Sequence, residues 1–170
     1  LADLRIGILT IREKWEKHLI GKGSYIAQDY LSKKYPIKIG LDNIVINARL
    51  LPNEKIIKLI SQLDDKEALI YNDIMIAARM DESQFKRLVT EDSSEDLIGM
   101  DISNDEDLIQ LITQAYDLFM YNGEQLDMDC QLVTHDNTSA SISETNRCVN
   151  KENIFIEEEA EVEFAHHNAS

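Results

Sequence analysis

Residues 43–63 (NIVINARLLPNEKIIKLISQL) are the stretch that most constrains how this chain can fold. They open with NIVIN at 43–47, a short β-branched run that is typical of a buried strand. After a loop, Asn53 is predicted to cap a helix, because its side chain can accept a hydrogen bond from the first helical turn. The apolar face of this helix consists of Ile56, Ile57, Ile60 and Leu63. A strand, a loop and a helix in this order form one βα step, so the sequence predicts an α/β fold.

The end of this strand is the candidate ligand site. In open α/β sheets, ligands bind beyond the carboxyl ends of the strands, where Asn47 and Arg49 would lie. The amide of Asn47 can donate and accept hydrogen bonds, as a sugar hydroxyl or a base edge requires. Arg5 and Arg49 are expected beside this edge, facing the N-terminal helix, and their charges suit a phosphate group. We therefore predict that Arg5, Asn47 and Arg49 bind substrate. The alternatives are an ordinary connection without a ligand, and surface ion pairs of Arg5 with Asp3 and of Arg49 with Glu54.

The charge of the chain limits its partners. The 170 residues include 32 acidic and 17 basic side chains, which gives a net charge of −15. General nucleic-acid binders and anionic-membrane binders need a cationic surface, so both classes are excluded. A nucleotide is still compatible, because a few local cations or a bound Mg²⁺ can hold its phosphates. The length suits one domain, or one domain with a small appendage.

The cysteines and the hydropathy of the chain indicate where it resides. Cys130 and Cys148 have neither metal-ligand spacing nor a CxxC arrangement, and we interpret them as free thiols in a reducing cytoplasm. No apolar run is long enough to cross a bilayer, and no signal peptide is visible. The sequence therefore predicts a cytoplasmic protein.

Helices and strands alternate along the first half of the chain. Residues 1–19 are predicted as one helix with an apolar face. This face consists of Leu4, Ile8, Ile11, Trp15 and Leu19. Further helices are expected at 25–34 and 81–89. Residues 68–71 and 74–78 are expected to pair as a hairpin around Asn72 and Asp73, which makes the sheet mixed.

The second half is predicted from weaker patterns. Residues 90–107 are dense in carboxylates without the ligand spacing of an EF-hand, which indicates a solvated loop. A helix with Phe119 inward is expected over 105–119. A turn at 121–124, a segment at 125–133 that suits a strand or a helix, and a loop at 134–145 follow. Residues 153–165 alternate apolar and acidic side chains, which indicates either an edge strand or the first coil of a β-helix.

Six segments carry a resemblance to a known family. They are LADLRIGILTIREKWEKHL at 1–19, SYIAQDYLSKKYP at 24–36, NIVINARLLPNEKIIKLI at 43–60, ALIYNDIMIAARM at 68–80, ISETN at 142–146 and ENIFIEEEAEVEFA at 152–165. Together they resemble bacterial sugar nucleotidyltransferases that are similar to the bifunctional N-acetylglucosamine-1-phosphate uridylyltransferase/glucosamine-1-phosphate acetyltransferase. The resemblance covers most of the chain and is weakest between residues 81 and 141.

This resemblance implies a Rossmann-like nucleotide-diphospho-sugar transferase domain with a mixed sheet at 1–145, and the beginning of a left-handed parallel β-helix at 146–170. It implies transfer of a nucleotidyl group from an NTP to a sugar 1-phosphate, with Mg²⁺ as cofactor. It also implies a homo-oligomer, trimeric if the β-helix is complete. The glycine-rich loop of the wider superfamily would precede Leu1, and Arg49 stands where that superfamily has a metal-binding aspartate. We therefore assign no catalytic or metal-binding residue and expect very slow or absent transfer by this chain.

Two other functions stay open at this point. One is a catalytically silent domain of the same fold that serves as an interaction or assembly module, which the absent glycine loop and Arg49 favour. The other is the N-terminal part of a hexapeptide-repeat acyltransferase whose catalytic β-helix lies further along the chain. Residues upstream and downstream of this sequence would distinguish the three.

Overall fold

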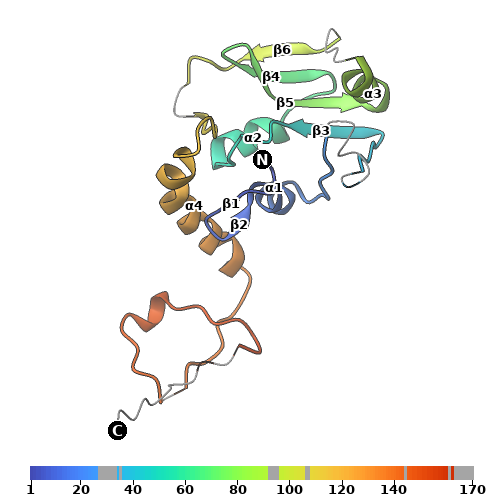
Figure 1. The fold of residues 1–170 in the computed structure, drawn as a ribbon. Coiled ribbons are helices and arrows are strands. Elements are labelled where there is room, and N and C mark those ends of the chain that lie inside the picture. The colour runs from blue at the N-terminus through green and yellow to red at the C-terminus, as the bar shows by residue number, and fades with distance from the viewer. Residues whose placement is uncertain are drawn as a thin grey trace.

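The computed structural model describes residues 1–26, 34, 36–91, 96–105, 108–143, 145–160 and 162. Its centre is a four-stranded sheet (Figure 1). In spatial order the strands are β3 (Asp42–Ile46), β5 (Ile74–Asp81), β4 (Glu67–Tyr71) and β6 (Ile98–Asp101). Strand β5 is antiparallel to β3 and to β4, whereas β6 is parallel to β4. The predicted α/β fold with a mixed sheet is therefore confirmed.

The turn between β4 and β5 has the geometry that its sequence predicts. Asn72 and Asp73 both have positive φ, 48° and 63°. Two consecutive left-handed residues characterise a type I′ turn, whose twist matches that of the strands it joins. Asn and Asp tolerate this conformation better than other residues with side chains. The predicted hairpin is confirmed.

Helix α2 (Glu54–Ser61) follows β3, as the βα step requires. Asn53 caps it, because its Oδ1 accepts a hydrogen bond from Ile56 N–H at 2.9 Å. The Asn53 amide also donates to the Leu108 carbonyl at 2.9 Å, so the cap ties the helix to a distant segment. Ile56 and Ile60 are buried against the sheet, and the predicted cap and helix are confirmed. The predicted strand is present, but its expected burial is wrong, because β3 is an edge strand whose residues are exposed or half-buried.

Helices pack on both faces of the sheet. The larger core cluster joins the sheet to α2 and to α1 (Ile11–Leu19), and the smaller one lies under α3 (Glu82–Glu91). The pairing of β4 with β5 shifts between Leu69 and Ile70, which leaves Ile76 as the extra residue of a β-bulge. Because of this bulge, Ile76 and its neighbour Ala77 both belong to the larger cluster.

The prediction of one helix over residues 1–19 is wrong for its first half. Residues 5–10 form a small antiparallel hairpin, β1 (Arg5–Ile6) and β2 (Leu9–Thr10), and Gly7 adopts a left-handed φ of +73° in its turn. Helix α1 begins after Thr10, whose Oγ1 accepts from Glu13 N–H at 3.2 Å. The Glu13 carboxylate accepts from Thr10 N–H at 2.8 Å, which completes a capping box.

Strand β6 lies where the sequence predicted a solvated loop. All four of its residues are exposed, and it joins the sheet edge through parallel pairing with β4. Ile98 N–H donates to Lys66 O at 2.7 Å, and Ile102 N–H donates to Ile70 O at 2.9 Å. Parallel pairing joins segments that are distant in sequence, here through a crossover that includes α3, so no local pattern predicts it. The many acidic residues around this strand also favoured the prediction of a loop.

Helix α4 (Asp117–Thr134) differs most from the expected secondary structure. The predicted helix over 105–119 is wrong in its described part before Asp117, because residues 110–112 pair with 49–51 around a bridge between Leu50 and Leu111. The predicted turn at 121–124 lies inside α4, and the ambiguous segment 125–133 is helical. Phe119, which we expected inward, is 84% exposed.

Two predictions remain, the helix at 25–34 and the β-helix coil after residue 145. Residues 27–33 of the helix expected at 25–34 lie outside the described residues, and Tyr25 and Ile26 are not helical. Among residues 146–160 and 162 there is a short 3-10 helix (Lys151–Asn153) and no strand, so the described part gives no support to a β-helix coil. None of the helices described is both long and apolar enough for a membrane span.

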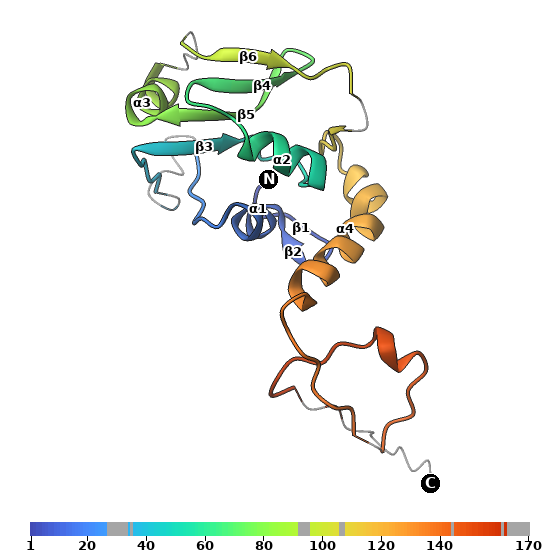
Figure 2. The ribbon, with the colours of Figure 1, turned by 180° about the vertical axis from the view of Figure 1, so that it is seen from behind.

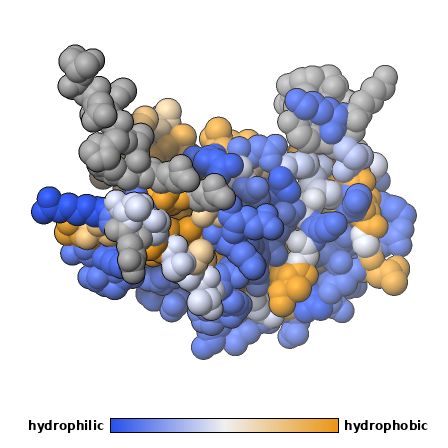
Figure 3. Space-filling view, turned by 90° about the horizontal axis from the view of Figure 1, so that it is seen from below, coloured by the Kyte–Doolittle hydropathy of each residue, from blue (hydrophilic) through white to orange (hydrophobic). Residues whose placement is uncertain are grey.

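The two ribbon views agree on how the elements are arranged. Strand β3 is the sheet edge nearest α1, and α4 runs from the level of α2 past the β1–β2 hairpin (Figures 1 and 2). The segment after α4 lies beyond the end of that helix, away from the sheet (Figure 2). From below, the surface is mostly hydrophilic, with hydrophobic residues in separate patches (Figure 3).

Candidate functional site

A cleft of about 660 Å³ lies between α1 and the edge strand β3. Helix α1 lines it with Arg12, Trp15, Glu16 and Leu19. The opposite wall is β3 together with Asn47 and Ala48, which follow its carboxyl end. Residues 21–26, Lys38 and Gly40 also line the cleft. The cleft therefore includes the strand end that the sequence analysis selected, and it faces α1 as expected.

The β3 wall offers backbone hydrogen-bonding groups. Among the described residues, strand β3 pairs with β5 alone, so in this part of the chain its other edge has no strand partner. Asn47 N–H donates to Ile76 O at 2.8 Å. In antiparallel pairing every second residue of a strand directs its backbone groups to the same neighbour, so the odd-numbered residues of β3 hydrogen-bond with β5. The backbone groups of Ile44 and Ile46 then point to the open edge, because antiparallel pairing alternates along a strand. Such groups can bind a base edge or sugar hydroxyls.

The α1 wall carries a network of charged groups. Arg12 Nη1 donates to both oxygens of Glu16, at 2.9 and 3.1 Å, and Arg12 Nε lies 3.4 Å from Asp3 Oδ1. Tyr25 donates its hydroxyl hydrogen to the same Asp3 oxygen at 2.5 Å, and Arg12 Cζ stands 5.8 Å from the Tyr25 ring centroid. Glu16 Oε1 also accepts from Gly23 N–H at 2.8 Å. These contacts hold residues 21–25 against α1.

The same contacts shift the pKa values of the groups involved. Burial, with the hydrogen bond to Asp3, raises the pKa of Tyr25 to about 12. The Tyr25 hydroxyl, followed by the Arg12 guanidinium, lowers the pKa of Asp3. The Glu16 carboxylate raises the pKa of Arg12. At neutral pH the phenol is therefore protonated, so Tyr25 serves as a neutral hydrogen-bonding aromatic group at the cleft rather than as a base.

Two lysines give the cleft additional positive charge. Lys22 and Lys38 line it, and within the described residues neither makes a salt bridge. Lys38 is held in position through its backbone, since its N–H donates to Ser24 Oγ at 3.0 Å and its carbonyl accepts from the same hydroxyl at 3.2 Å. With Arg12, the described part of the lining contains three cations against the carboxylates Glu16 and Asp42, although the whole chain has a net charge of −15.

Asn47 lies at the cleft, but its side chain already has partners. Its Oδ1 accepts from Arg49 N–H at 3.0 Å, which forms an Asx turn, and its Nδ2 donates to Met75 O at 3.2 Å. The amide therefore shapes the exit of β3. A ligand can use the remaining lone pair and the second N–H of this amide.

The two arginines predicted for this site do not line the cleft. Arg5 lies in β1 and donates to the Ile8 carbonyl across its own turn. Its expected partner Asp3 binds Arg12 and Tyr25 instead. Arg49 is exposed in the turn after β3, where its carbonyl accepts from Ile112 N–H at 2.9 Å.

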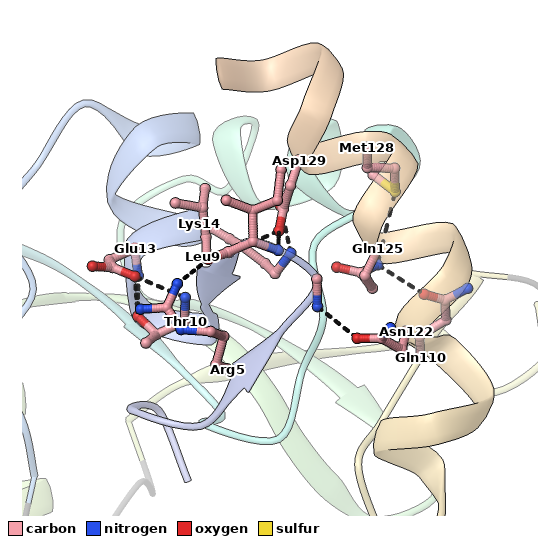
Figure 4. A network of polar contacts seen from close by, with 12 residues as sticks. Arg5, Leu9, Thr10, Glu13, Lys14, Gln110, Asn122, Gln125, Met128 and Asp129 are labelled. Atoms are coloured by element: carbon pink, nitrogen blue, oxygen red, sulfur yellow. Dashed lines mark hydrogen bonds and ion pairs between the residues drawn. The ribbon is translucent and has the colours of Figure 1, made fainter. Parts of the chain in front are cut away.

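A buried ion pair joins α1 to α4, and the sequence analysis missed it. Lys14 and Asp129 point toward each other from the two helices (Figure 4), with side chains 1% and 2% exposed. The second oxygen of Asp129 accepts from Ile8 N–H at 2.9 Å and from Leu9 N–H at 3.0 Å. Lys14 lies three residues after Ile11 and next to Trp15, and this inward position on α1 is the one signal for its burial.

Burial shifts the pKa values of Lys14 and of its neighbour His18. It lowers the pKa of Lys14, and the hydrogen bond to Asp129 only partly offsets this. It also lowers the pKa of half-buried His18, one turn further along α1, and the positive charge of Lys14 acts in the same direction. Both groups are cationic when protonated, so the folded state disfavours added protons here.

We expect the stability of the protein to fall as the pH decreases from 7 to 5.5. The folded-state pKa of His18 lies below its unfolded value of 6.5, so the unfolded state binds more protons in this range. Urea unfolding at several pH values measures the effect, and His18→Gln should reduce the slope. His135→Gln is the matched control, because His135 is exposed. An unchanged slope in His18→Gln would contradict the prediction.

The described residues do not form a magnesium site at the cleft. Asp42 is held by Arg79 through two hydrogen bonds, at 3.0 and 2.8 Å, which lowers the pKa of this carboxyl. Glu16, the other carboxylate in the lining, is held by Arg12. No group of three potential metal ligands occurs in the part of the chain that the structure describes. Mg²⁺ therefore stays a prediction of the family resemblance.

Comparison with known proteins adds the family. No curated protein and no solved structure matches the chain significantly. The profile of the family described as sugar nucleotidyl transferase matches residues 1–138, which contain the sheet, the cleft and the whole of α4. This range is well over half of the 170 residues. The chain therefore belongs to the sugar nucleotidyl transferase family.

Proposed function

We propose that this domain is a sugar-1-phosphate nucleotidyltransferase whose phosphorylated ligands bind in the cleft between α1 and β3. One observation carries the proposal. In a chain with a net charge of −15, Lys22, Lys38 and Arg12 line a cleft that follows β3 and includes its carboxyl end. Strand ends of α/β sheets are the usual ligand positions, and local cations are what phosphate groups require.

The reaction that we propose needs little beyond positioning and positive charge. A phosphate oxygen of the sugar 1-phosphate forms a bond to the α-phosphorus of the NTP. The bond between the α-phosphorus and the bridging oxygen breaks, and pyrophosphate leaves with that electron pair. Ammonium groups beside these phosphates lower the barrier by offsetting negative charge. Lys22 and Lys38 supply this charge, while backbone groups of Ile44 and Ile46 orient the sugar or the base.

The kind of transferase, its appended domain, its oligomeric state and its cofactor also stay proposals. The sequence resemblance favours a uridylyltransferase of the bifunctional kind, with an NTP and a sugar 1-phosphate as substrates. An appended acyltransferase domain and a trimer would follow from the same resemblance. Mg²⁺ would enter with the nucleotide phosphates, since the carboxylates of the cleft are held by Arg12 and Arg79.

A second candidate function is a catalytically silent interaction module. The engagement of both cleft carboxylates by arginines favours it, because a silent domain no longer needs free metal ligands. The two candidates differ in turnover rather than in fold. Pyrophosphate release with several pairs of NTP and sugar 1-phosphate, measured with added Mg²⁺, separates them: even very slow turnover supports the transferase, and tight binding with no detectable turnover supports the module.

We expect a UDP-sugar or dTDP-sugar to bind the protein, and Lys22→Gln and Lys38→Gln each to weaken that binding about tenfold. A tenfold loss corresponds to ~1.4 kcal/mol, a typical contribution of one charged contact. Isothermal titration calorimetry measures the affinities, and circular dichroism checks that the variants fold.

Arg5→Gln and Arg49→Gln are the matched controls. Each removes one positive charge from an exposed residue that does not line the cleft. Binding by these two variants should equal that of the wild type. Equal weakening in all four variants would indicate a general charge effect, and it would contradict the assignment of the cleft.

A further inference from the structure

The outward face of α4 carries an apolar seam. Its residues recur at alternating spacings of three and four along the helix: Tyr116, Phe119, Gly123, Leu126, Cys130 and Val133. Phe119 is 84% exposed, and Met120 beside it is 75% exposed. A seam with this 3,4 spacing is the pattern by which one α-helix packs along another. In both ribbon views α4 lies at the margin of the molecule (Figures 1 and 2).

The middle of this seam is open. A Cβ atom added to Gly123 would meet nothing within 4 Å, although a glycine in a helix interior weakens the helix. Without a side chain at this position, the backbone of another helix can approach α4 closely. The inward face of α4 is already used, since Asp117, Gln125 and Asp129 are buried against the domain.

The charges on α4 indicate what kind of helix fits. The helix contains four acidic residues and no lysine or arginine. Asp117 and Asp129 are buried, whereas Glu124 and Asp127 are exposed next to the seam. A second copy of this chain would bring its own Glu124 and Asp127 close to those of the first copy, and each protein has a net charge of −15. A partner with basic residues beside its apolar positions is complementary instead.

We propose that the outward face of α4 docks an α-helix of another protein, one with apolar residues at 3,4 spacing flanked by lysines or arginines. Phe119 and Leu126 are the apolar anchors, Gly123 sets the close approach, and Asp127 faces the basic flank. This site is separate from the cleft, so it does not depend on the proposed transferase function.

Two synthetic helical peptides test the proposal. Both have leucine at the 3,4 positions, and the flanking positions are lysine in one and glutamate in the other. Fluorescence anisotropy at physiological salt should show that the lysine peptide binds at least tenfold more tightly than the glutamate peptide. The double variant Phe119→Ser/Leu126→Ser should lose at least tenfold in affinity for the lysine peptide.

A control variant distinguishes this seam from any exposed apolar residue. Leu41→Ser/Ile98→Ser removes two residues that are also highly exposed but lie away from α4, and it should bind like the wild type. Binding that survives Phe119→Ser/Leu126→Ser would show attraction by charge alone and overturn the proposal. Absence of peptide binding would also overturn it. A wild-type dimer in sedimentation that the double variant abolishes would identify a second copy as the occupant instead.

Discussion

Replacing Asp129 with alanine is expected to lower the free energy of unfolding by about 3–5 kcal/mol, as removal of one member of a buried ion pair usually does. The Lys14 ammonium would remain buried without a partner, since its side chain is only 1% exposed. The backbone N–H groups of Ile8 and Leu9 would lose their acceptor as well. Urea unfolding followed by the fluorescence of Trp15, the one tryptophan in the chain, measures the change.

Two further variants make this prediction specific. Asp127→Ala removes an exposed carboxylate from the same helix, and it should change stability by less than about 0.5 kcal/mol. In the double variant Lys14→Met/Asp129→Leu, both charges are replaced by apolar groups, and stability should partly recover. If Asp129→Ala destabilises no more than Asp127→Ala, then the pair does not hold α4 to α1.

Replacing Gly7 with alanine is expected to cost more than about 2 kcal/mol, since a left-handed residue with a side chain is strained and nearby atoms leave no room. The φ of Gly7 is +73°, and its added Cβ would lie 2.7 Å from Asp129 Oδ2 and 2.8 Å from the Gln125 carbonyl oxygen. The second of these atoms belongs to the backbone of α4. The variant can therefore be accommodated only if the β1–β2 turn and α4 move apart.

Gly123→Ala is the matched control for this substitution, and its effect should have the opposite sign. Gly123 lies inside α4 with open space around it, so alanine should stabilise the helix by about 0.5–1 kcal/mol. Urea unfolding of both variants measures the difference. Two variants of similar stability would contradict the close approach of the turn to α4.

The residues that line the cleft were only partly predictable from the sequence. The cleft includes the carboxyl end of β3, where the local βα pattern predicted a ligand site because α/β sheets bind ligands at strand ends; ligand binding there stays a prediction. Lys22 and Lys38 were missed. They lie near the two ends of the long connection between α1 and β3, and only the folded chain brings both to one cleft. Arg5 and Arg49 were selected for their charge and for their expected place beside this edge, and neither lines the cleft.

Sequence alone determined the parts of this protein that depend on neighbouring residues. The cap of α2 by Asn53 and the turn at Asn72 and Asp73 each involve contacts within a few residues, and both were predicted. The tertiary structure decided the pairing of β6 and the inward face of α4. Lys14 shows the physical reason: its partner Asp129 lies 115 residues away, and only their contact makes burial of this charge tolerable.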